Sequence, residues 1–70
     1  MKFYLVKIQQ GSVKTFAVLS ALLPEGQSDP PVEQLAGRSG CHESNIVGVE
    51  THGSPMKAAA SGRSWVSGGG

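Results

Sequence analysis

The fold is decided by residues 3–19, which read FYLVKIQQGSVKTFAVL. Two runs rich in β-branched and aromatic residues, 3–8 and 13–19, flank a short polar link and predict two strands. Gly11 and Ser12 suit a two-residue type II′ turn, because glycine adopts the positive φ that the first turn position requires. We therefore predict a β-hairpin centred on Gly11-Ser12.

This turn sets which residues share each face of the hairpin. One face pairs Tyr4 with Leu19, Val6 with Ala17 and Ile8 with Thr15. Because this face is almost entirely apolar, we expect it to form the core. The opposite face is mixed, with charged residues near the turn and apolar residues toward the far end: Lys7, Lys14, Phe3, Leu5, Phe16 and Val18.

Two further elements are predicted downstream of the hairpin. Residues 28–37 read as a short helix, in which Ser28 or Asp29 caps the first amides and Gly37 ends the helix. Residues 45–51 read as a third strand, in which Gly48 marks a bulge or a close backbone approach. The sequence thus predicts an α+β fold with a small antiparallel sheet in ββαβ order.

The C-terminal part differs in composition from the rest of the chain. Residues 54–70 are rich in glycine and serine, with one possible helical turn starting at Ser54-Pro55. Such a composition provides little apolar surface to offset the entropy of ordering. We therefore predict a small domain over residues 1–53 and a flexible tail over residues 54–70.

Charge and size exclude several classes of protein. The 70 residues allow one domain, and six Lys and Arg against five Asp and Glu give a formal net charge of +1. These charges form no basic stripe of the kind nucleic-acid binders carry. No apolar run approaches the ~20 residues of a membrane-spanning helix. The single cysteine, Cys41, excludes an intramolecular disulfide and favours a cytoplasmic location.

The residues with potential site chemistry are few: Cys41, His42, Glu43 and His52. Zinc requires about four ligands in a tetrahedral array, and adjacent Cys and His side chains rarely reach one ion together. A Cys41–His52 nucleophilic pair would also need an orienting group and oxyanion donors in a pocket. We therefore expect no enzymatic activity, no metal and no cofactor.

The leading hypothesis is a protein-binding or oligomerising module. One predicted helix covers one face of the sheet, which leaves Phe3, Leu5, Phe16 and Val18 uncovered on the other. Exposed apolar patches usually mark interfaces, so we expect a homodimer or a partner protein there. Trp65 is added as an interaction residue, because tryptophan often dominates binding energy at interfaces.

The alternative is a small nucleic-acid-binding regulator that inserts its hairpin into a groove. Only Lys7 and Lys14 flank the hairpin turn, so such binding would be weak and strongly dependent on salt. In style alone, the short chain and immediate hairpin resemble the small accessory proteins of phages and other mobile elements. This likeness covers residues 1–20 and implies no functional residue.

Overall fold

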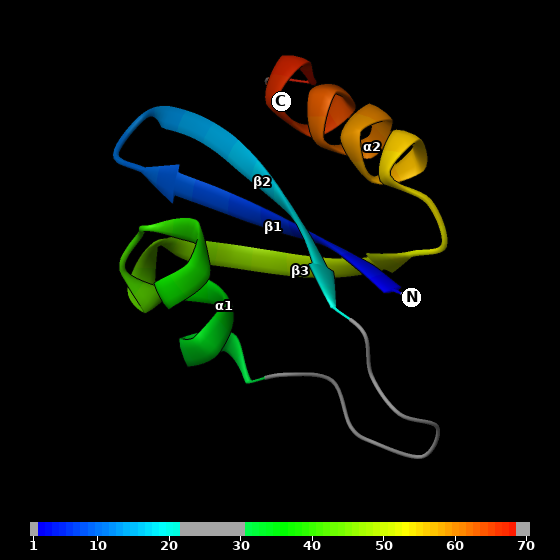
Figure 1. The fold of residues 1–70 in the computed structure, drawn as a ribbon. Coiled ribbons are helices and arrows are strands. Elements are labelled where there is room, and N and C mark those ends of the chain that lie inside the picture. The colour runs from blue at the N-terminus through cyan, green and yellow to red at the C-terminus, as the bar shows by residue number, and fades with distance from the viewer. Residues whose placement is uncertain (1, 22–30, 69–70) are drawn as a thin grey trace.

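The structure is a computed structural model that describes residues 2–21 and 31–68. Its elements are β1 (Lys2–Gln10), β2 (Val13–Ala21), α1 (Val32–Ser39), the 3-10 turn η1 (Glu43–Asn45), β3 (Ile46–His52) and α2 (Pro55–Ser67). The strands form an antiparallel sheet in the order β2-β1-β3, so β1 is central and β3 lies at an edge (Figure 1). The α+β class predicted from the sequence is confirmed.

The hairpin has the predicted register. Tyr4 faces Leu19, Val6 faces Ala17 and Ile8 faces Thr15. Gly11 has a φ of 62°, whereas no described residue other than glycine has a positive φ. A positive φ at Gly11 but not at Ser12 is what a type II′ turn requires.

The third strand is also confirmed, one residue further along the chain than predicted. Lys7 faces Gly48 and Ile8 faces Ile46, so Val47 is the extra residue of a β-bulge. The bulge lies next to Gly48, where the sequence indicated an irregularity. It bends β3 at its N-terminal end and leaves the rest of the strand in regular pairing with β1.

Helix α1 differs from its prediction at both ends. Its N-cap is Pro31, which provides no side-chain cap, and the predicted caps at residues 28 and 29 lie outside the described residues. Gly37 lies inside the helix and does not end it. The helix ends at Gly40, whose φ of 74° places it in the left-handed region and whose amide reaches the carbonyl of Gly37. Gly37 and Gly40 both fit the sequence pattern of a helix stop, but only Gly40 adopts the left-handed conformation that ends a helix.

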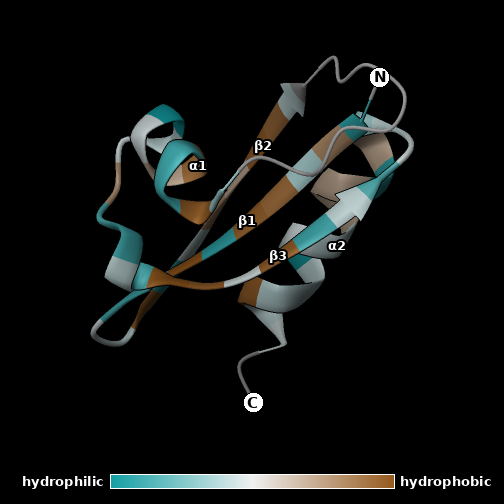
Figure 2. Cartoon of the chain, turned by 90° about the horizontal axis from the view of Figure 1, so that it is seen from below, coloured by the Kyte–Doolittle hydropathy of each residue, from teal (hydrophilic) through white to brown (hydrophobic). Residues whose placement is uncertain are grey.

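The hydrophobic core lies between α1 and the sheet face that the hairpin register predicted. Leu35 of α1 packs with Tyr4 and Val6 of β1, and all three side chains are almost fully buried. Partly buried apolar residues surround them: Ile8, Ala17, Leu19 and Ile46. Apolar residues run along β1 and β2, whereas α1 is mostly polar on its outer side (Figure 2).

The structure of the C-terminal segment contradicts the sequence prediction. A flexible tail with one helical turn was expected from residue 54, but residues 55–67 form the 13-residue helix α2. The predicted start is right, because the Ser54 hydroxyl accepts a hydrogen bond of 3.1 Å from the amide of Lys57. The helix continues because its small residues permit close packing, and Ala58 and Gly62 are buried.

Helix α2 lies on the sheet face opposite to α1 (Figure 1). At Gly62 it approaches β2 so closely that a Cβ atom there would lie 2.6 Å from Cγ of Phe16. The folded part therefore has three layers, helix on sheet on helix, rather than one helix on a sheet. No described helix combines the length and the apolar character needed to span a membrane.

Candidate functional site

The four sheet residues predicted to form an interface lie beneath α2. Leu5 has no exposed surface, and Phe3, Phe16 and Val18 are half-buried. The expectation that this face is uncovered is therefore wrong, because α2 supplies a second helix that the sequence analysis did not predict. The interface predicted there loses the observation on which it rested.

Trp65, the fifth predicted interaction residue, has a partner within the chain. It is half-buried on α2, and the Nζ atom of Lys14 lies 5.6 Å from the centre of its ring. A cation–π contact of this kind contributes about 0.5–1 kcal/mol at a partly exposed site. Trp65 and Lys14 thus help to hold the end of α2 against the hairpin.

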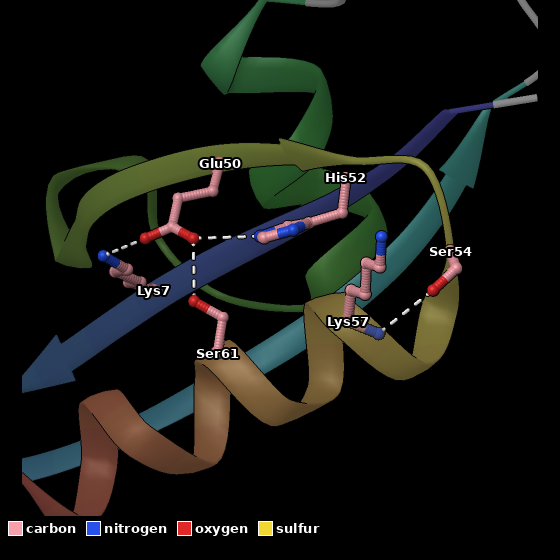
Figure 3. A network of polar contacts seen from close by, with 6 residues as sticks. All are labelled: Lys7, Glu50, His52, Ser54, Lys57 and Ser61. Atoms are coloured by element: carbon pink, nitrogen blue, oxygen red, sulfur yellow. Dashed lines mark hydrogen bonds and ion pairs between the residues drawn. The ribbon is translucent and has the colours of Figure 1, made fainter.

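A polar cluster joins β1, β3 and α2, and we call it the Glu50 cluster: Lys7, Glu50, His52 and Ser61. The register places Glu50 opposite Leu5 and His52 opposite Phe3, so both side chains lie on the sheet face toward α2. The Glu50 carboxylate accepts bonds of 2.8 Å from the Ser61 hydroxyl and 2.9 Å from His52 Nε2. It also pairs with the Lys7 ammonium (Figure 3).

These donors determine the charge state of Glu50. The hydrogen bond from Lys7, followed by those from Ser61 and His52, lowers the pKa of Glu50 from 4.5 to about 2. Each donor stabilises the ionised carboxylate more than the protonated form. Glu50 is therefore charged at neutral pH and links two strands and a helix.

The Glu50 cluster has the residue types of a hydrolytic triad but a different connectivity. In a triad the histidine lies between the nucleophile and the carboxylate, so that it can remove the hydroxyl proton. Here Ser61 and His52 both bond to the same oxygen, Oε1 of Glu50. Ser61 donates a hydrogen bond directly to the Glu50 carboxylate, which is only weakly basic. The described residues enclose no pocket beside Ser61. This connectivity fits an anchor for α2.

The remaining candidate ligands do not converge. His42 bonds through Nδ1 to the hydroxyl and the amide of Ser44, which caps the η1 turn. Cys41 is a half-buried free thiol. In residues 2–21 and 31–68, no three His, Cys, Asp or Glu side chains are grouped so that they could hold a metal ion.

A row of exposed β-branched residues lies along β3. Val47 is 56% exposed and Val49 is 37% exposed, and Thr51 is also exposed. Val49 and Thr51 face Val6 and Tyr4 across the strand pair, so they lie on the α1 side of the sheet. The eight-residue α1 packs on β1, β2 and η1 and contacts β3 little, so it leaves these residues uncovered. We call Val47, Val49 and Thr51 the β3 stripe.

The backbone of β3 adds a second feature to this surface. Within the described part of the chain, β3 has one hydrogen-bonded neighbour, β1. An edge strand presents unpaired amides and carbonyls along its free side. The strand carries neither lysine nor proline, although its bulge at Val47 and the charged Glu50 are two other features that protect edges.

Sequence reasoning predicted β3 but missed its exposed stripe. The signal was present, because Val47, Val49 and Thr51 alternate with Gly48 and Glu50 at the period of a strand. Predicting the stripe would have required knowing which face of β3 the helix α1 leaves uncovered. Comparison with models of protein families, with curated proteins and with solved structures finds no match to this chain.

Proposed function

We propose that this chain is a small, non-enzymatic, cytoplasmic protein-binding module, and that its binding surface is the free edge of β3. The observation that carries the proposal is a row of exposed β-branched residues on an edge strand, Val47, Val49 and Thr51. A partner strand added to such an edge gains main-chain hydrogen bonds, and alternate side chains provide specificity. The single cysteine fits a reducing compartment.

The other edge strand, β2, is a weaker candidate. Both helices pack against β2, whereas α2 contacts β3 less than the other two strands. Lys14 also lies on β2, and its side chain crosses toward Trp65. These features favour β3 as the binding edge.

The nucleic-acid alternative has less support. Lys7 pairs with Glu50, and Lys14 lies over the Trp65 ring, so both lysines of the hairpin interact within the chain. Phosphate contacts would have to compete with these interactions. A gel-shift assay at low salt would detect nucleic-acid binding if it occurs, and such binding would lose affinity steeply as salt rises.

A matched pair of variants tests the proposed function. Val49→Lys places a charge in the β3 stripe, and Val13→Lys makes the same change at a residue of β2 that is 60% exposed. Each protein is immobilised and incubated with an extract of its native cells, and the retained proteins are quantified by mass spectrometry. We expect a partner that wild type and Val13→Lys retain and Val49→Lys loses. Equal retention by all three proteins would refute a binding surface on β3.

A further inference from the structure

We propose that the strand accepted by β3 is β3 of a second copy of this chain. The two strands would run antiparallel about a two-fold axis and join the two sheets into one. This inference rests on the proposed function of the β3 edge and specifies its partner. A two-fold contact needs only one self-complementary surface, which is why it is the commonest way for identical chains to associate.

The β3 stripe is nearly symmetric about Val49. With the axis at Val49, that residue faces its own copy, and Thr51 lies near Val47, the bulged residue of the other chain. All three residues are exposed and β-branched. Cross-strand pairs of β-branched residues are among those that stabilise sheets. The exposed residues of one copy thus match those of the other.

Charge distinguishes the register with its axis at Val49 from the register with its axis at Glu50. An axis at Glu50 would place two carboxylates directly opposite each other, which destabilises an antiparallel pair. An axis at Val49 instead places Glu50 opposite Gly48 of the other copy. Glu50 is already paired with Lys7, so it brings no unpaired charge to the contact. The Val49 register is therefore preferred over the Glu50 register.

The expected strength follows from the size of the contact. Each copy contributes a strand of seven residues, Ile46–His52. Interfaces of this kind fall at the small end of the range for specific association, where complexes are weak and form reversibly. A concentration-dependent dimer is expected, rather than a permanent one.

Engineered cysteines test the register directly. In a Cys41→Ser background, Val49→Cys places two thiols opposite each other at the axis, within the reach of a disulfide. Thr51→Cys is the matched control, because its two copies would lie about 13 Å apart along the strands, too far for a disulfide. With oxidised glutathione present, we expect a covalent dimer from Val49→Cys and little from Thr51→Cys. Equal cross-linking of both variants, or none of Val49→Cys, would overturn the Val49 register.

Sedimentation of the purified proteins separates this inference from the proposed function. Wild type and Val13→Lys should shift with concentration toward twice the monomer mass of 7.2 kDa, and Val49→Lys should remain a monomer. A monomeric wild type would overturn self-pairing. If Val49→Lys still lost a partner from the extract in that case, the proposed function would stand with a different partner. If Val49→Lys changed neither result, both would fail.

Discussion

Glu50 is the residue on which three elements converge. Its carboxylate accepts from Lys7 on β1, His52 on β3 and Ser61 on α2. About a third of its side chain is exposed, so solvent screens these interactions and limits their strength. The main effect of the Glu50 cluster is therefore to orient α2 on the sheet, and its contribution to stability is small.

Removing this charge should weaken the fold in a pH-dependent way. We expect Glu50→Gln to lower the free energy of unfolding at pH 7 by about 1 kcal/mol, the upper end for partly exposed ion pairs. The folded-state pKa of about 2 lies below the ordinary 4.5, so the stabilisation is complete above pH 4.5 and is lost as the pH falls toward 2. Urea denaturation across this range should show the wild type converging on the variant.

Glu43→Gln is the control for this experiment, because Glu43 is exposed in the η1 turn. It should leave the stability at pH 7 nearly unchanged. If the difference in stability between wild type and Glu50→Gln stayed constant from pH 7 to pH 2, the ionised Glu50 carboxylate would not be the group that stabilises the fold.

At the scale of elements, α2 is the part of the fold that sequence reasoning misread. Its start was visible in Ser54-Pro55, but its glycines and serines suggested a tail. Gly62 is in fact required by packing, because it lies against the Phe16 ring, and Ser61 reaches Glu50. These contacts join residues 11 or more positions apart in the chain. Local propensity could not predict them, so composition alone was misleading here.

The hairpin could be predicted because its determinants are local. Alternating apolar residues and a glycine with positive φ specify both the register and the turn. The third strand was also predicted, within one residue of its observed bounds. That the α1 side of β3 stays uncovered could not be predicted, because it depends on where α1 packs on the sheet. The candidate site, which needs that exposed face, was therefore missed.

Two glycine substitutions separate packing from helix propensity. Gly62→Ala should destabilise the protein by about 1–3 kcal/mol, because the added methyl group overlaps the Phe16 ring and the core must shift. Gly37→Ala lies within α1 with open space around its Cβ, so it should be neutral or stabilise by up to about 1 kcal/mol. Thermal denaturation of both variants measures the difference. A similar response at both sites would mean that α2 does not pack closely on β2.

At the scale of the whole molecule, α2 completes a domain that would otherwise be too small. Without it, the sheet face bearing Leu5 and Phe16 would be exposed to water. A domain of this size is already marginal, because small chains bury a low fraction of their surface. We therefore expect a chain ending at Gly53 to bind a hydrophobic dye and to lack a cooperative thermal transition. A cooperative transition near that of the full chain would show that α2 is dispensable.

Amide hydrogen exchange, followed by NMR at increasing protein concentration, tests most directly whether β3 pairs with a second copy. Amides on the free side of β3, within Ile46–His52, should exchange more slowly as the concentration rises, because they become hydrogen-bonded between chains. Amides of β2, within Val13–Ala21, should be unaffected. Exchange from β3 that is independent of concentration, or protection that appears along β2 instead, would contradict pairing through the β3 edge.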